Sequence, residues 1–234
     1  MILMIERVKT GIPGLDELIE GGIPKESTVL LAGVAGAGKT IFGVQFVYNG
    51  ALYHNEPGVY ISLEEDPERI VKNISLTFGW DLRSLMEKNL LSFITAELYS
   101  FEKLIDMIEG QVSKIGAKRL VIDPSTVLGL YFEKTLEVRK SILEISRLLK
   151  RLGCTSLLIS EVPEGSKRIS SFGVEEFVAD GIIILYYFKE EGFFTRALCV
   201  RKMRATNHDT GIHPIQITSN GIVVFPKERI FEKS

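Results

Sequence analysis

The 234-residue sequence contains little cysteine, no long apolar run and almost no net charge. Its two cysteines, Cys154 and Cys199, lie in apolar runs without a CxxC partner, so we expect buried, reduced thiols. No apolar run reaches the roughly 18 residues of a membrane span, and the early charged stretch MILMIERVK is too short for a signal peptide. We therefore expect a cytoplasmic protein without a membrane partner. The net charge of −2 gives the whole chain no bias toward nucleic acid.

The composition is typical of an ordinary globular protein, with 45% hydrophobic and 25% charged residues. Internal repeats, low-complexity tracts and linkers are not visible, so we expect residues 1–234 to form one domain. Within it, the patterns predict a lead-in segment over 1–26, a core over 27–180 and a β-rich edge over 181–234.

Short apolar runs alternate with longer helical patterns along most of the chain. Strands are predicted at 28–32, 59–63, 91–94, 120–122, 155–160, 182–187 and 197–200. Helices are predicted at 40–51, 67–78, 101–115 and 136–152. This alternation indicates βαβ units and an α/β fold with a mostly parallel, twisted sheet flanked by helices. From Ile182 onward, strands follow one another through the short turns FKEEGFFT and TSNG, which predicts antiparallel hairpins at the C-terminal edge.

The stretch GVAGAGKT fits the phosphate-binding pattern G-x-x-x-x-G-K-[ST] and stands between a strand and a helix. We call it the P-loop segment; its predicted nucleotide-binding residues are Gly33, Val34, Ala35, Gly36, Ala37, Gly38, Lys39 and Thr40. The glycines allow close backbone approach, so that N–H groups at the helix N-terminus can point at phosphate oxygens. Lys39 can reach the β- and γ-phosphates, and Thr40 can offer a hydroxyl to Mg²⁺. The alternative is a glycine-rich turn with a solvated lysine.

Acidic residues follow two of the predicted strands. Asp123 ends the strand 120–122, where ligands bind in open α/β sheets, which suits a second oxygen ligand for Mg²⁺ beside Thr40. A turn-forming aspartate before Pro124 is the alternative. Glu64 and Glu65 follow the strand 59–63. Two adjacent carboxylates repel each other, and where they are partly desolvated one pKa rises toward the range useful to a general base that activates water.

The alternative interpretation of the acidic residues that follow the strand 59–63 is that they form the first turn of the next helix. We assign that structural role to Asp66 and Glu68. Glu64 remains the first candidate for the base, and Glu65 the second.

The ordered motifs together resemble the KaiC-like branch of the RecA/RadA/DnaB superfamily of ATPases. They are TGIPGLDELIEGGIP, GVAGAGKT, the paired glutamates, VIDPST, LLISE and VRKMRATNH, and the resemblance runs from about Thr10 to Pro226. It implies a RecA-like core that binds ATP or ADP with Mg²⁺ between neighbouring subunits of a homo-oligomer, usually a hexamer. By the same resemblance, Glu64 and Glu65 match tandem catalytic glutamates, and Ser160 matches a γ-phosphate sensor. A serine that caps a strand is the alternative for Ser160.

The stretch RALCVRKMRATNHD carries cations after an apolar run. Lys202, Arg204 and His208 match family residues that reach into the next subunit's site. The resemblance thus implies that they act in trans, Lys202 and Arg204 on the γ-phosphate and His208 on the nucleotide or as an orienting group. A solvated turn is the alternative.

Two departures from the family pattern bear on function. The stretch VEEFVAD has Glu176 and Phe177 where the autophosphorylating domain of the circadian-clock member of the family has Ser/Thr before an aspartate matching Asp180. This argues against autokinase activity. In KMRAT, Ala205 stands where the family usually has glycine.

Three functional classes follow from these motifs. The first is a ring ATPase that couples hydrolysis to a regulatory switch or a protein partner, which the sequence does not identify. The second is a DNA- or RNA-handling ATPase, for which the loop PEGSKRISSFG offers only Lys167, Arg168 and Phe172. A nucleotide-binding regulator with little turnover is the third. The choice of ATP over GTP rests on the resemblance.

Overall fold

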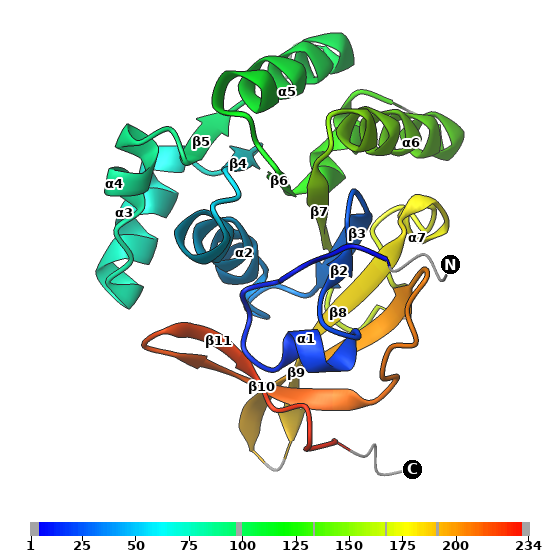
Figure 1. Ribbon diagram of the computed structural model, residues 1–234. Helices are drawn as coiled ribbons and strands as arrows, with labels where there is room; N and C mark the ends of the chain where they lie inside the picture. The colour runs from blue at the N-terminus through cyan, green and yellow to red at the C-terminus, as the bar shows by residue number, and fades with distance from the viewer. Residues whose placement is uncertain (1–4, 97–99, 133, 167, 191, 231–234) are drawn as a thin grey trace, which may run out of the picture.

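The computed structural model describes residues 5–96, 100–132, 134–166, 168–190 and 192–230 (Figure 1). The helices in this part of the chain are α1 (Leu15–Leu18), α2 (Lys39–His54), α3 (Pro67–Phe78), α4 (Leu82–Glu87), α5 (Phe101–Ile115), the 3₁₀ helix η1 (Ser125–Leu130), α6 (Thr135–Arg151) and α7 (Glu175–Val178). The strands are β1 (Arg7–Val8), β2 (Ile23–Pro24), β3 (Thr28–Gly33), β4 (Gly58–Ser62), β5 (Leu91–Thr95), β6 (Arg119–Asp123), β7 (Thr155–Glu161), β8 (Gly181–Glu190), β9 (Phe193–Met203), β10 (Ile212–Thr218) and β11 (Gly221–Val224).

Within the described residues, nine strands form one sheet in the order β11-β10-β9-β8-β3-β7-β6-β4-β5. The six strands from β8 to β5 run parallel, whereas β9, β10 and β11 continue the sheet in antiparallel pairs. This confirms the predicted α/β fold, with a mostly parallel sheet and antiparallel strands at its C-terminal edge. The short strands β1 and β2 pair separately in the lead-in segment.

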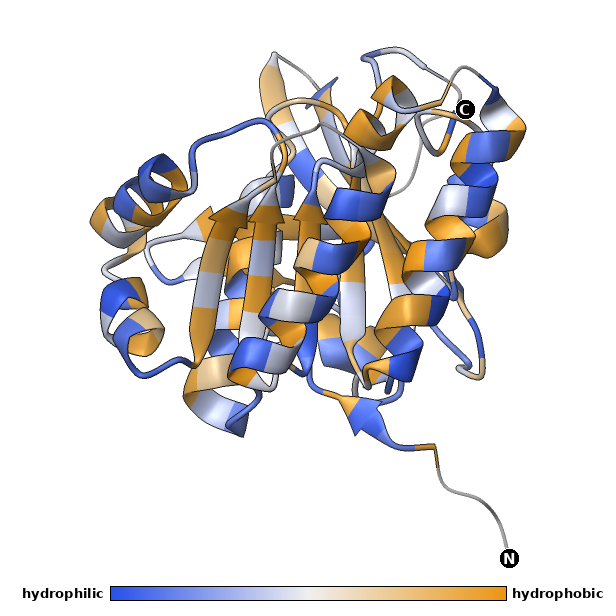
Figure 2. Ribbon diagram, turned by 90° about the horizontal axis from the view of Figure 1, so that it is seen from above, coloured by the Kyte–Doolittle hydropathy of each residue, from blue (hydrophilic) through white to orange (hydrophobic). Residues whose placement is uncertain are grey.

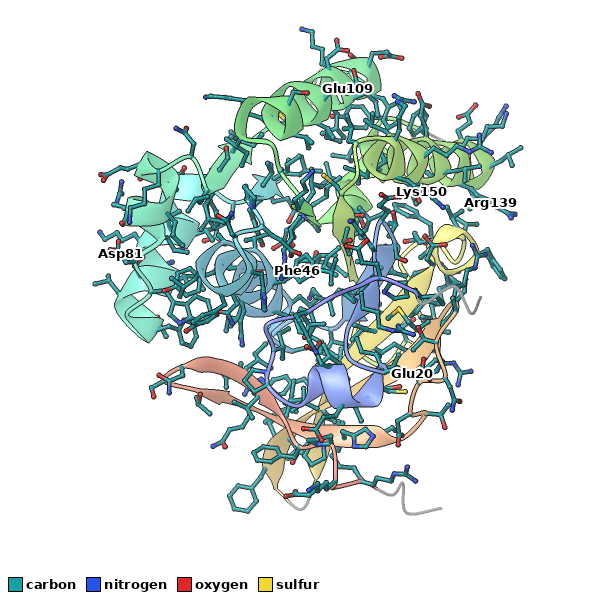
Figure 3. The ribbon with its side chains drawn as sticks, in the orientation of Figure 1. Glu20, Phe46, Asp81, Glu109, Arg139 and Lys150 are labelled. Atoms are coloured by element: carbon teal, nitrogen blue, oxygen red, sulfur yellow. The ribbon has the colours of Figure 1, made fainter. Side chains whose placement is uncertain are left out.

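Alternating residues of the central strands face two separate hydrophobic clusters. Val121 of β6 packs toward α2 and α3, whereas its neighbours Leu120 and Ile122 pack toward α5 and α6. This is the two-residue period of a strand that is buried on both faces. Figure 2 shows the result, a largely hydrophobic sheet beneath helices whose outer faces are hydrophilic. In Figure 3, Phe46 lies within the molecule, while Glu109 and Arg139 lie on its periphery.

The ends of the helices follow their local sequence signals. Asp66 caps α3 by accepting a hydrogen bond from the backbone N–H of Glu68, and Pro67 occupies the first turn. Gly79 ends the same helix in the left-handed conformation, with φ of 68°. The structural role predicted for Asp66 and Glu68 is therefore confirmed.

The structure differs from the sequence prediction mainly in the β hairpin and in short helices. Strands β8 and β9 extend beyond the apolar runs at 182–187 and 197–200, because main-chain pairing continues through polar residues toward the hairpin tip. The short helix α4 and the 3₁₀ helix η1 were not predicted, because six residues carry too little periodicity.

Both cysteines are buried and unpaired, as expected. Burial raises the pKa of the Cys154 thiol to about 11, which makes it a poor nucleophile. Across the part of the chain that the structure describes, no helix has the length and apolar character needed to cross a membrane.

Candidate functional site

The P-loop segment joins β3 to α2 at the carboxyl edge of the parallel strands. Gly33 ends β3, and a Cβ atom there would lie 2.7 Å from the carbonyl oxygen of Leu185 on β8. Gly36 and Gly38 have φ angles of 77° and 101°, in the left-handed region that favours glycine. Gly38 also caps α2, so the first N–H groups of that helix open into the loop. The backbone of this loop therefore favours glycine at positions 33, 36 and 38.

The Lys39 side chain folds back over the loop. Its ammonium Nζ donates a hydrogen bond of 3.0 Å to the carbonyl oxygen of Val34 and lies 3.8 Å from Oε1 of Glu161. Burial lowers the pKa of Lys39, while Glu161 and Asp123 act in the opposite direction. The Lys39 side chain is 8% exposed and lies between the Val34 carbonyl oxygen and the Glu161 carboxylate.

Asp123 and Thr40, the two predicted metal ligands, are in direct contact. The Thr40 hydroxyl donates a 2.9 Å hydrogen bond to Oδ2 of Asp123, and the Tyr60 hydroxyl donates to the same oxygen. Burial raises the pKa of Asp123, while the hydrogen bonds from Tyr60 and Thr40 oppose that rise. The structure therefore places a carboxylate and a hydroxyl, both hard oxygen donors, beside the start of α2.

Glu64 and Glu65 have different surroundings although they are adjacent. Burial raises the pKa of the Glu64 carboxyl, and the charges of Glu161 and Asp123 add to the rise. Glu65 instead lies 3.5 Å from Nε of Arg69 and accepts a backbone hydrogen bond from the Ser62 hydroxyl. The predicted rise of the Glu64 pKa agrees, and so does the predicted contribution of desolvation, but the repelling charges are those of Asp123 on β6 and Glu161 on β7 and not that of Glu65.

Glu161 and Tyr60 were missed in the sequence. Glu161 directly follows Ser160 at the end of β7, where an acidic residue after an apolar run was the available sequence signal; its approach to Lys39 depends on the pairing of β7 with β3. Tyr60 is hidden in an apolar run, and no sequence signal separates it from a core aromatic residue. A cavity of about 320 Å³ opens beside Glu161, lined also by Ala35, Thr126, Val162, Pro163 and Ser171.

Ser160, the predicted phosphate sensor, is buried and oriented toward the α7 region. Its hydroxyl lies 3.3 Å from Oε1 of Glu175 and accepts a hydrogen bond from the backbone N–H of Ser171. Glu175 is itself buried and also accepts a 2.7 Å hydrogen bond from the Ser170 hydroxyl. The sensor role stays a prediction, whereas the next residue of β7, Glu161, lies 3.8 Å from Lys39 Nζ.

The three residues predicted to act in trans lie away from the P-loop segment of their own chain. Lys202 Nζ donates to the carbonyl oxygens of Ala179 at 2.6 Å and Glu176 at 3.1 Å. Arg204 forms a 3.0 Å ion pair with Asp180, and 58% of its side chain is exposed. No hydrogen bond or ion pair among the described residues joins Lys202, Arg204 or His208 to residues 33–40.

The loop that carries Arg204 and His208 is held by the lead-in segment. Arg7 donates to the Ala205 carbonyl oxygen at 3.1 Å and to the Thr206 hydroxyl at 2.8 Å. Ala205 has a φ of 55°, in the left-handed region that favours glycine. The lead-in segment therefore helps to shape the loop around Arg204.

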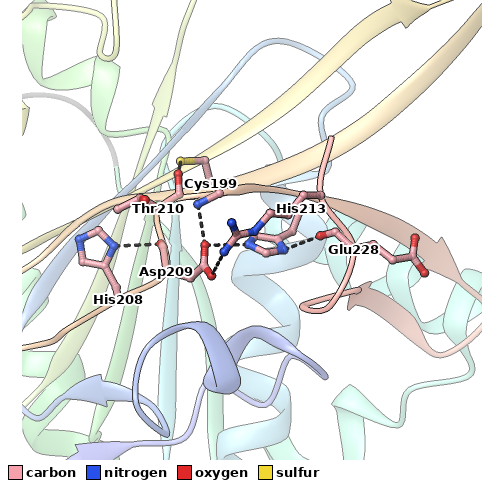
Figure 4. Close-up of polar contacts among 8 residues, drawn as sticks. Cys199, His208, Asp209, Thr210, His213 and Glu228 are labelled. Carbon is pink, nitrogen blue, oxygen red and sulfur yellow. Dashed lines mark hydrogen bonds and ion pairs between the residues drawn. The ribbon is translucent and has the colours of Figure 1, made fainter. Parts of the chain in front are cut away.

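A second set of contacts surrounds Asp209, next to His208 (Figure 4). Its carboxylate accepts hydrogen bonds from the Gly211 N–H at 2.6 Å and from Nη2 of Arg229 at 2.7 Å, and lies 3.1 Å from Nε2 of His213. The buried His213 ring also contacts the Glu228 carbonyl oxygen through Nδ1, at 2.7 Å. The hydrogen bond from the Gly211 N–H is the main cause that lowers the pKa of Asp209 to about 2.

Comparison with known proteins covers nearly the whole chain. A family model described as "ATPase: KaiC" matches residues 8–229. A UPF0273 protein of Pyrococcus furiosus is 39% identical over an alignment of 251 positions, which covers 98% of this chain and 100% of that protein. The circadian clock oscillator protein KaiC of Thermostichus vulcanus is 35% identical over 232 residues, which cover 95% of this chain and 44% of that protein.

A solved structure agrees with these matches. The crystal structure of a KaiC-like protein from Pyrococcus horikoshii superposes with a TM-score of 0.87 at 38% identity, and the match covers 95% of this chain and 100% of that one. The resemblance carried by the sequence motifs and the RecA-like fold that it implied are therefore confirmed.

The lowered pKa of Asp209 predicts how the stability of the loop depends on pH. A carboxyl that shifts from an ordinary pKa of about 3.9 to about 2 on folding stabilises the fold fully above about pH 4, and this contribution disappears as the pH falls through 2. Asp209→Asn should lower the free energy of unfolding at pH 7 by about 1–2 kcal/mol, because hydrogen bonds to a charged group are lost.

Urea denaturation between pH 2.5 and pH 7 measures this effect. The difference between parent and Asp209→Asn should shrink toward the acid end, while the exposed control Asp106→Asn should differ little from the parent throughout. A deficit in Asp209→Asn that stays constant with pH would contradict the assignment.

Proposed function

Because the chain belongs to the KaiC ATPase family, we propose that it binds ATP at the P-loop segment and hydrolyses it to ADP and phosphate. The observation that carries this proposal is the convergence of Lys39, the Thr40–Asp123 pair and Glu64 at one edge of the sheet, around Glu161. These side chains come from the start of α2, the end of β6 and the segment after β4, and they supply a phosphate-binding cation, oxygen ligands and a candidate base.

Phosphate binding requires Lys39 to exchange its present partners. When ATP enters, the ammonium leaves the Val34 carbonyl oxygen for the phosphate oxygens, which are stronger, charged acceptors. The N–H groups at the start of α2 add further donors. The loop therefore binds phosphate with groups that are already close together.

The donors present fit Mg²⁺. This ion is usually held by one or two carboxylates together with substrate phosphates, and Asp123 with the Thr40 hydroxyl offers such a partial set. No cluster of three or more histidine, cysteine or acidic side chains suited to a metal occurs in the described part of the chain, so the remaining ligands come from nucleotide and water. When bound, Mg²⁺ neutralises charge that develops on the phosphates.

Glu64 is the proposed general base. Its raised pKa improves proton acceptance from the attacking water, and its exposure leaves the carboxylate accessible to solvent. Glu65 is oriented toward Arg69 and is proposed to assist by polarising the same water.

We extend the proposal to the assembly. Lys202, Arg204 and His208 are proposed to complete the site of a neighbouring subunit in a ring, with six subunits as the expected number. Among the described residues, no hydrogen bond or ion pair joins them to their own P-loop segment, and Arg204 is exposed, with an ion pair to Asp180 that can be exchanged for phosphate; both observations support this role. We propose that hydrolysis in the ring drives a regulatory switch or acts on a protein partner.

Nucleic-acid handling is the alternative function. Lys167 lies outside the described residues, and Arg168 is exposed. Phe172 packs against Gly129, where an added Cβ would lie 2.4 Å from its ring, so this ring is engaged with η1 rather than free to stack on bases. The loop therefore offers weak support for this alternative.

Removal of the phosphate-binding cation tests the site directly. Lys39→Ala should raise the dissociation constant for ATP–Mg²⁺ at least about 100-fold, or about 2.7 kcal/mol, because a compact cation that faces the phosphates is lost. Isothermal titration calorimetry measures this constant, with the exposed-lysine variant Lys72→Ala as control. Parental affinity in Lys39→Ala would refute the proposed site.

Replacement of each glutamate by glutamine separates binding from chemistry. Glu64→Gln should bind ATP normally but hydrolyse it at least about 100-fold more slowly, because the base is lost while size and shape are kept. Glu65→Gln, the matched control, should lose less. Phosphate release under saturating ATP gives both rates, and near-parental turnover in both variants would remove these residues from the mechanism.

Mixing two inactive variants tests action in trans. Arg204→Ala and Lys39→Ala should each be nearly inactive, since related arginine residues contribute roughly 10³–10⁵ in rate. Mixed rings contain some interfaces that join an intact P-loop segment to an intact Arg204, so hydrolysis should partly recover. An active monomer, or unchanged turnover in Arg204→Ala, would exclude the trans role.

A further inference from the structure

Strand β8 extends past the end of β3 and runs alongside the P-loop segment. Gly33, the last residue of β3, pairs with Leu185, so Tyr187 lies two residues further along and on the same face of β8. A Cβ atom on Gly36 would lie 3.1 Å from Cε1 of Tyr187. The Tyr187 ring therefore packs directly against the backbone of the loop.

Arg196 of β9 completes this contact. It is the cross-strand partner of Tyr187, and its guanidinium carbon lies 4.4 Å from the centre of the Tyr187 ring. The ring of Phe194, which also lies on β9, is 4.9 Å from the Tyr187 ring. Nε of Arg196 donates a 3.0 Å hydrogen bond to the carbonyl oxygen of Gly36.

The Gly36 carbonyl group belongs to the same planar peptide unit as the N–H of Ala37. In a trans peptide these two groups point in opposite directions, so a donor that fixes the carbonyl also fixes the N–H. The Ala37 N–H points to the Val34 carbonyl oxygen, at 3.3 Å, which is the oxygen that also accepts from Lys39 Nζ at 3.0 Å. The Ala37 N–H thus lies on the Lys39 side of the loop.

We propose that Arg196 is a positioning residue for the P-loop: by holding the Gly36 carbonyl, it keeps the Ala37 N–H on the Lys39 side of the loop, where phosphate binds in the proposed function. This inference rests on the proposed function, because it assumes that phosphate binds on the Lys39 side. Gly36 can adopt many backbone conformations, so an unrestrained loop loses more entropy when it closes on a ligand. The hydrogen bond from Arg196, which is supported by the Tyr187 ring, removes part of that freedom in advance.

Three variants test the role of Arg196. Arg196→Ala should raise the dissociation constant and the KM for ATP about tenfold, which corresponds to about 1.4 kcal/mol, with kcat within about threefold of the parent. Arg196→Lys should be intermediate, because lysine keeps the charge but lacks the planar group that covers Tyr187 while donating. Lys189→Ala removes the same charge from the exposed part of the same hairpin and should bind ATP like the parent.

Amide hydrogen exchange and thermal melting of the nucleotide-free protein give a second test of the role of Arg196. In Arg196→Ala, the amide hydrogen of Ala37 should exchange with solvent at least about tenfold faster than in the parent, as observed by NMR. The melting temperature of the nucleotide-free protein should stay within a few degrees of that of the parent, because a half-buried surface contact is lost and the hydrophobic clusters are intact.

Several outcomes would overturn the proposal. Parental ATP affinity in Arg196→Ala would do so, and so would tighter binding, which would mean that the contact restrains the loop in an unsuitable form. An equal loss in Lys189→Ala would assign the effect to general charge. If Arg196→Ala does not fold, parental affinity in Arg196→Lys decides against the proposal. A parent that binds ATP no better than Lys39→Ala refutes the proposed function instead, and the two failures are thereby distinguished.

Discussion

The buried carboxylate of Asp123 is the interaction on which this end of the molecule depends. A charged group that is 9% exposed is costly unless hydrogen bonds satisfy it, and here the hydroxyls of Thr40 and Tyr60 do so. These partners belong to α2 and β4, so one side chain of β6 ties the helix that follows the P-loop segment to two strands of the sheet. The relative position of Thr40 and Asp123 therefore does not depend on a bound ligand.

Around this centre, acidic groups outnumber the single buried lysine. Asp123 and Glu161 act on Lys39, and both also act on Glu64; the pKa of Glu64 and that of Asp123 are raised, mainly by burial, with a further contribution from Glu161. Such a site attracts cations and repels an uncompensated phosphate. A nucleotide therefore fits this chemistry best together with a divalent cation, which reverses the local charge.

The β8–β9 hairpin connects two parts of the chain that are separate in sequence. Arg196 on β9 contacts the P-loop segment, whereas Lys202 on the same strand contacts the backbone around α7. Beyond the hairpin, Arg7 of the lead-in segment and Asp209 fix the loop that follows. One antiparallel extension of the sheet thus supports both the proposed cis contacts and the residues proposed to act in trans.

The sequence alone determined the alternation of the main strands and helices along the chain, the P-loop segment, and the acidic residues that follow β4 and end β6. These features depend on local pattern, namely residue periodicity, glycine spacing and polar residues at strand ends, which a linear chain displays directly. The tertiary structure alone decided that Glu161 approaches Lys39, that Tyr60 binds Asp123, that Glu64 and Glu65 diverge, and that Arg196 holds Gly36. The physical reason is that these contacts join residues between 4 and 160 positions apart, or differ between adjacent side chains, and they are set by strand order and side-chain direction.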